Sequence, residues 1–141
     1  MSNRPDAICR RPLVLIVEDD PETRNFYSHA LERAGFHIEQ AHNGHQALEK
    51  AVESSPDLIV TDIAVPGLDG IELCRRLRAD VRTREIPVLA ITGYDDRHYP
   101  DRARVAGADQ VLIKPCEVLV LIAEARRLLA GDRVSGNRVI E

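Results

Sequence analysis

The sequence predicts an α/β fold, a doubly wound domain in which helices cover both faces of a parallel five-stranded sheet. Five short apolar segments rich in β-branched residues alternate with five segments that carry apolar residues at helical spacing. No internal repeat interrupts this alternation. The chain has 141 residues, of which 44% are apolar and 30% charged, and these values are typical of one globular domain.

The strands are predicted from apolar runs that end at polar or turn-forming residues. In chain order they cover residues 13–17, 36–41, 58–60, 85–91 and 110–113. The second is an edge strand, because its apolar residues alternate only weakly. Pro87 is tolerated in the fourth because it stands near the start, where a missing N–H matters least.

The helices are predicted from apolar spacing and from residues that start or end helices. Asp20-Pro21 starts the first helix, which ends at Gly35, and Asn43-Gly44 leads into the second. The third begins at Gly70, the fourth ends at Gly107, and the fifth covers residues 117–129. We expect residues 1–11 to form a flexible arm, residues 12–130 the folded domain and residues 131–141 a flexible tail.

Charge and cysteine content exclude several classes of function. The net charge of −4 opposes direct binding to nucleic acid or to an anionic membrane. No apolar run is long enough to cross a membrane, and the first residues lack the apolar core of a signal peptide. The three cysteines are widely spaced, without a Cys-x-x-Cys pair, so we expect a reduced protein in the cytoplasm.

A run of arginines surrounds the third helix, at positions 75, 76, 78, 82 and 84. Such a run could bind an acidic partner. The alternative, which the sequence favours, is a solvated helix face.

Polar side chains stand where four of the predicted strands end. Glu18 and Asp19 follow the first strand, Asp62 the third, Thr92 the fourth and Lys114 the fifth. Asp62 alone could be a loop acid that accepts hydrogen bonds. In an open parallel sheet, however, ligands bind beyond the carboxyl ends of the strands, so we expect all five side chains at one rim.

These five residue types together predict phosphoryl chemistry. Three carboxylates in one place repel one another unless a hard cation such as Mg²⁺ lies between them. The Lys114 ammonium suits a phosphate, and the Thr92 hydroxyl can donate to a phosphoryl oxygen. Asp62 is then the candidate nucleophile, since aspartate forms acyl phosphates when the incoming oxygens are neutralised.

At this point the chain resembles the receiver domain of two-component response regulators, over roughly residues 12–130. The resemblance is carried by five segments in order: residues 14–21 (VLIVEDDP), 62–70 (DIAVPGLDG), 91–93 (ITG), 107–109 (GAD) and 114–115 (KP). It implies a flavodoxin-like fold with strand order 2-1-3-4-5. It also implies a signalling switch that accepts a phosphoryl group from a histidine kinase or phosphotransfer protein and regulates a partner by contact.

The resemblance also implies roles for single residues. Asp62 would be the phosphoacceptor, Glu18 and Asp19 the acidic pair that holds Mg²⁺, and the Ala64 carbonyl a further metal ligand. Thr92 and Lys114 would sense the phosphoryl group. Such a domain is not an enzyme for other substrates; it promotes only its own phosphoryl transfer and a slow autodephosphorylation.

Several residues depart from the family pattern. Val111 stands where receivers often carry an aromatic switch residue, and Cys116 stands where phenylalanine is frequent. Cys116 is either a redox sensor or, as we prefer, a small buried filler. Ala64 has no polar side chain to position an attacking water, whereas Tyr94 could lean over the phosphoryl group, so we expect slow self-dephosphorylation.

The start of the last helix is apolar where related chains usually carry acids. Leu119 and Val120 therefore either form a partner or self-association surface near the fourth and fifth helices, with a homodimer as one outcome, or pack under the preceding loop. No output domain follows residue 130 in this sequence, so we expect the signal to pass by contact with another protein, unless the sequence is a fragment of a longer regulator. The sequence names neither the kinase nor that partner.

Three other functions fit the sequence less well. An aspartyl-phosphate phosphatase needs a second Asp two positions after the nucleophile, where this chain has Ala64. A nucleotide or flavin binder needs a Gly-rich loop after the first strand, where this chain has acids. A receiver-like module that binds partners without phosphorylation stays open.

Overall fold

The computed structural model describes residues 11–64, 67–93, 99–131 and 139–140. Strands and helices alternate along it in the order β1 (Leu13–Val17), α1 (Pro21–Arg33), β2 (His37–Ala41), α2 (Gly44–Ser54), β3 (Leu58–Asp62), α3 (Gly70–Ala79), β4 (Val88–Thr92), α4 (Tyr99–Ala106), β5 (Gln110–Ile113) and α5 (Val118–Leu129). A two-residue strand, β6 (Val139–Ile140), follows. The alternation predicted from the sequence is confirmed.

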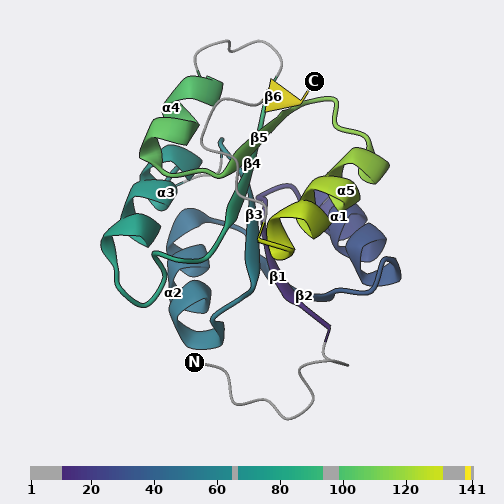
Figure 1. Ribbon diagram of the computed structural model, residues 1–141, viewed down its shortest axis with the longest axis horizontal. Helices are drawn as coiled ribbons and strands as arrows, with labels where there is room; N and C mark the ends of the chain where they lie inside the picture. Colours follow the sequence, from purple (N-terminus) through teal and green to yellow (C-terminus); the bar gives the residue numbers. More distant parts are fainter. Residues whose placement is uncertain (1–10, 65–66, 94–98, 132–138, 141) are drawn as a thin grey trace.

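All strands are parallel and lie in the order β2-β1-β3-β4-β5-β6 (Figure 1). The predicted order 2-1-3-4-5 is therefore confirmed, and the sequence did not predict β6. Residues 139–140 belong to the segment expected to be a flexible tail, and here they pair with β5. Residues 132–138 and 141 of that tail and residues 1–10 of the expected arm lie outside the described residues.

Two layers of helices enclose the sheet. Figure 1 shows α1 and α5 on one face and α2, α3 and α4 on the other. Alternate residues of β1 illustrate the division, because Leu15 packs with the three-helix side and Ile16 with α1 and α5. Each face thus has its own apolar core, and the central strands β3 and β4 are buried along their whole length.

Side chains cap the helices where the sequence placed their starts. The Asp20 carboxylate accepts from the Thr23 N–H at 3.0 Å, with Pro21 at the first helical position. Asn43 caps α2 by accepting from the Gln46 N–H at 2.7 Å, and Asp69 caps α3 by accepting from the Glu72 N–H at 2.9 Å. These caps set the helix entry points immediately after the strand ends.

The fourth strand is shorter than predicted, because it begins at Val88 and not at residue 85. Residues 81–85 form a turn, which the Thr83 hydroxyl closes by donating to the Leu77 carbonyl at 2.7 Å. The Pro87 carbonyl then accepts from the Ile59 N–H of β3, so ladder bonding starts at the proline. The Lys114–Pro115 peptide bond is cis. Among the described helices, none is long and apolar enough to cross a membrane.

Candidate functional site

The carboxyl ends of the four central strands bring polar side chains to one rim. β1 leads into Glu18, β3 ends in Asp62, β4 ends in Thr92 and β5 leads into Lys114. The strands deliver these residues to the same edge because they are parallel and in matched register, with Asp62 opposite Ile91 and Thr92 opposite Ile113.

An ion pair joins the ends of β3 and β5 across β4. The Lys114 ammonium lies 2.5 Å from Asp62 Oδ2 and 3.9 Å from Glu18 Oε1. The other Asp62 oxygen, Oδ1, accepts from the Ala64 N–H at 2.9 Å. Asp62 is 8% exposed and Glu18 4% exposed, so both carboxyl groups are largely removed from water.

Two buried carboxyl groups, those of Glu18 and Asp62, share the Lys114 ammonium as their cation. Burial, the largest effect, and the neighbouring Asp62 carboxyl together raise the pKa of Glu18 to about 7, against the lowering effects of the Asp20 N–H and of Lys114. Burial alone would lower the pKa of Lys114, but the ion pair with Asp62 outweighs it and the pKa is raised. Lys114 is therefore a cation here, whereas burial opposes the charged form of Glu18.

Two oxygens at the rim have no hydrogen-bond partner within the part of the chain that the structure describes. They are Thr92 Oγ1, on a residue that is 1% exposed, and Glu18 Oε1. A buried oxygen without a partner costs stability, so such atoms are rare in native proteins. Their position beside Asp62 and Lys114 suits a site that receives a cation and a phosphoryl group.

The remaining predicted metal ligands are less buried. Asp19 and Ala64 are exposed, and Ala64 contacts Asp62 through its N–H. Among the described residues, no group of three or more Asp, Glu, His or Cys side chains is close enough to enclose a metal ion. The donor set still fits Mg²⁺, because that ion needs only one or two carboxylates and keeps several waters.

Two glycines hold the loop after Asp62 in close contact with its neighbours. A Cβ at Gly70 would lie 2.7 Å from Ile63 Cα and 2.9 Å from the Asp62 carbonyl oxygen. A Cβ at Gly44 would lie 2.0 Å from the Leu68 carbonyl oxygen, so the first turn of α2 abuts this loop directly. The sequence placed both glycines at helix starts and did not predict this role, because the contacts depend on how the loop folds back onto α2 and α3.

The structure places the residues that depart from the family pattern in different environments. Val111 is fully buried in the core on the α2–α4 side of the sheet. Cys116 is a half-buried free thiol that packs against the other core, and burial raises the pKa of this thiol. Leu119 is 79% exposed, whereas Val120 packs against the core, so only Leu119 of that pair is free for a surface role. Tyr94 lies outside the described residues.

One member of the arginine run does not belong to a solvated face. Arg75 and Arg76 pair with Glu72 on the surface of α3, and Arg82 pairs with Asp80. Arg78 instead points inward and donates to the carbonyls of Gly107 and Ile86 and to Asp109. Arg78 thus ties α3 to the segments before β4 and β5. The sequence predicted only partner binding or a solvated helix face for this run and did not predict such a structural role.

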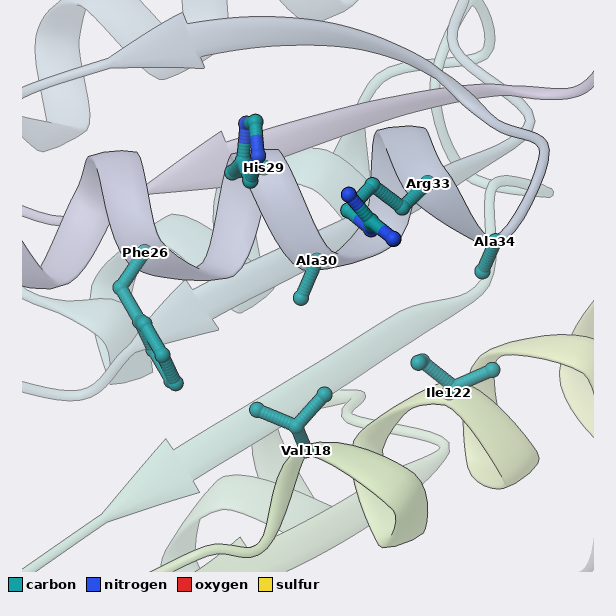
Figure 2. Close-up of a pocket in the computed structure, with 7 residues that line it drawn as sticks. All are labelled: Phe26, His29, Ala30, Arg33, Ala34, Val118 and Ile122. Carbon is teal, nitrogen blue, oxygen red and sulfur yellow. The ribbon is translucent and has the colours of Figure 1, made fainter.

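Two hollows flank the rim on the side of α1 and α5. The nearer, of about 820 Å³, is lined by Asp20, Glu22, Thr23, Phe26, Tyr27, Lys114, Pro115 and Cys116. The second, of about 430 Å³, is an apolar groove between α1 and α5. Figure 2 shows Phe26 and Ala30 on α1 pointing toward Val118 and Ile122 on α5. Phe26 lines both hollows, so an apolar surface leads from the groove to Lys114.

A doubly wound parallel sheet with acids, a hydroxyl and a lysine at one rim is the arrangement expected of a receiver domain, and the comparisons with known proteins identify the family. Residues 14–126 match the model of the response regulator receiver domain. The chain therefore belongs to the response regulator receiver family, whose members act in two-component signalling as switches rather than as classical enzymes.

The named relatives agree. A DNA-binding dual master transcriptional regulator of Synechocystis, RpaA, is 40% identical over 124 residues, which are 87% of this chain and 52% of that protein. This chain thus spans about half the length of the curated relatives it matches. The chemotaxis response regulator CheY4 of Vibrio cholerae superposes with a TM-score of 0.79 at 28% identity, over 84% of this chain and 99% of that one. The receiver domain of a histidine kinase from Syntrophus aciditrophicus gives 0.80 at 36% identity, over 92% and 97%.

Proposed function

We propose that this chain is a phosphorylation-dependent switch in which Asp62 accepts a phosphoryl group from a histidine kinase or phosphotransfer protein. The observation that carries the proposal is the Asp62 carboxylate at the end of a buried strand, 2.5 Å from the Lys114 ammonium. An Asp62 oxygen attacks the phosphorus of a phosphohistidine, the P–N bond breaks and the imidazole leaves with the electron pair of that bond. The product is an acyl phosphate on Asp62.

The other rim residues have defined parts in this proposal. Glu18, Asp19 and Asp62, with the Ala64 carbonyl, would hold Mg²⁺, which when bound offsets the charge of the phosphoryl oxygens. Lys114 transfers its ion pair from the carboxylate to a phosphoryl oxygen, and the Thr92 hydroxyl donates to another. Ala64 offers no side chain to orient an attacking water, so the acyl phosphate is lost slowly.

The partners follow from the position of the rim. A phosphodonor must reach Asp62, and the apolar surface around Phe26 lies beside Lys114, where such a partner can pack. The signal leaves through contact of the α4 to α5 face with a downstream protein or a second copy of the chain, with the exposed Leu119 near it. The free thiols of Cys74 and Cys116 fit the reducing cytoplasm.

Intact-mass spectrometry tests the proposal directly. The protein is incubated with Mg²⁺ and acetyl phosphate, and one added phosphoryl group is expected. Asp62→Asn abolishes the adduct, whereas the control Asp101→Asn, at an exposed position of α4, leaves it intact. No adduct on the unmodified sequence, or an undiminished adduct in Asp62→Asn, excludes the phosphoacceptor role and leaves the alternative of a module that binds partners without phosphorylation.

A further inference from the structure

The outer edge of β5 is covered by the chain itself. In the five-stranded sheet β5 would be an edge strand, with a row of backbone N–H and C=O groups open to pairing. In the structure β6 lies along this edge, between the two layers of helices (Figure 1). The pairing is parallel, with Val111 opposite Val139 and Leu112 opposite Ile140.

A buried polar network fixes this edge from the inside. Gln110 is fully buried, and its Oε1 accepts from the Val111 N–H at 2.9 Å while its Nε2 donates to Glu124 Oε1 at 3.3 Å. Arg127 donates twice to the same Glu124 oxygen, at 2.9 and 2.7 Å. The network anchors β5 to α5 through groups of the domain itself, so the shape of the edge does not depend on β6.

The contact with β6 is small compared with this network. Two residues provide few ladder hydrogen bonds, and a strand of that length has little stability of its own. The domain alone forms the edge of β5, and only the short strand β6 covers it. We therefore expect β6 to leave this edge readily and another extended segment to be able to take its place. Peptides that add a strand to a sheet edge are bound in this way, through the main chain.

We propose that the outer edge of β5 is a strand-docking site whose resident ligand is the chain's own segment around Val139 and Ile140. The ligand class is an extended, parallel segment with two consecutive β-branched residues. While the segment is docked, it keeps any other strand from pairing at Val111 and Leu112. The proposal of this docking site does not depend on phosphorylation of Asp62. Because β5 leads directly into Lys114, however, a docked segment contacts the strand that positions this rim cation.

Amide exchange in the full chain tests the docking. Val139→Pro combined with Ile140→Pro removes both N–H groups of β6, so we expect those amides of residues 110–113 that face β6 to exchange at least about fivefold faster. Val134→Pro is the matched control, since it places a proline in the same terminal segment five residues before Val139, and exchange stays as in the original sequence. Equal exchange in all three proteins overturns the proposal.

A peptide of residues 136–141 tests the site in trans by NMR. At about 5 mM, a concentration comparable to that of a tethered segment, it should shift the β5 amides of the double proline variant. The original sequence should shift much less, because its own segment competes. A version of the peptide with proline at both β-branched positions is the negative control. Absence of shifts in the double variant, or equal shifts in both proteins, overturns the proposal, and neither readout requires the phosphoryl chemistry to be correct.

Discussion

The Lys114 ammonium and the Asp62 carboxylate are in contact, 2.5 Å apart. The contact spans β4 and therefore joins the ends of two strands that do not pair with each other. A phosphoryl group on Asp62 would move the negative charge outward, and Lys114 would have to follow it. In the proposed switch, the end of β5 is thus the first element to move when Asp62 is phosphorylated. Val111 is small and fully buried, so it cannot act as the aromatic switch residue that receivers often carry at this position.

Removal of the Lys114 charge should affect both stability and chemistry. Lys114→Met keeps most of the apolar stem but leaves Asp62 and Glu18 without their shared cation. We expect unfolding in urea without Mg²⁺ to show a loss of about 2 kcal/mol, between the values for exposed and buried ion pairs. The yield of acyl phosphate should fall at least tenfold. If Lys114→Met is as stable as the original sequence, the contact between Lys114 and Asp62 does not contribute to the free energy of unfolding.

Glu18 should destabilise the metal-free protein and strengthen metal binding. Its buried carboxyl lies beside Asp62, and its Oε1 has no hydrogen-bond partner among the described residues. Glu18→Gln should therefore raise the free energy of unfolding without metal by about 1 kcal/mol, because one of two adjacent buried acids becomes neutral. Calorimetric titration should show Mg²⁺ affinity at least tenfold lower.

The exposed Glu53 on α2 provides the comparison for charge loss away from the rim. Glu53→Gln should leave both the unfolding free energy and the Mg²⁺ affinity unchanged. If Glu18→Gln binds Mg²⁺ as tightly as the original sequence, Glu18 is not a metal ligand.

Gly44→Ala should disturb the site from a distance. The added methyl meets the Leu68 carbonyl, and the loop between Asp62 and α3 must shift, which we expect to cost about 1–3 kcal/mol. Mg²⁺ affinity should fall as well, since Ala64 belongs to the same loop. Gly35→Ala is the control for backbone strain without a steric clash, because Gly35 has a φ of +108° and no atom lies within 4 Å of the position of an added Cβ. That variant should lose about 1 kcal/mol and keep its Mg²⁺ affinity.

Arg78→Lys should be costly although it preserves charge. The guanidinium donates at 3.0 Å to the Gly107 carbonyl, at 2.7 Å to the Ile86 carbonyl and at 2.8 Å to Asp109, and an ammonium cannot reach all three. We expect a loss of about 2–3 kcal/mol in urea unfolding, since buried carbonyls lose their donors. Arg76→Lys, in an exposed pair with Glu72, should change stability by less than about 0.5 kcal/mol. Equal effects of the two changes would mean that Arg78 is not a brace.

The fold and the rim were predictable for one physical reason: hydrophobic periodicity locates strands, and parallel strands all end at the same edge. That is how Asp62, Thr92 and Lys114 could be placed together without coordinates. The contacts of Gly44 with Leu68 and of Arg78 with Gly107 were not predictable, because they join segments whose packing depends on the crossing of helices, which periodicity does not encode. The pairing of β6 was missed because two residues are too few to give a strand signal.

The Thr92 hydroxyl should matter only in the phosphorylated state. It is buried without a partner among the described residues, so Thr92→Val, which keeps the shape, should leave the unmodified protein as stable or about 1 kcal/mol more stable. Thermal unfolding after treatment with Mg²⁺ and acetyl phosphate should then show less than half of the normal phosphorylation-induced shift in Tm.

A second buried threonine gives the contrast that decides the matter. Thr83 is equally buried, but its hydroxyl donates to the Leu77 carbonyl at 2.7 Å. Thr83→Val should therefore lose about 1–2 kcal/mol in the unmodified protein and keep the full phosphorylation-induced shift. If Thr92→Val is destabilised as Thr83→Val is and the phosphorylation-induced shift is unchanged, the Thr92 hydroxyl serves the resting fold and not the acyl phosphate.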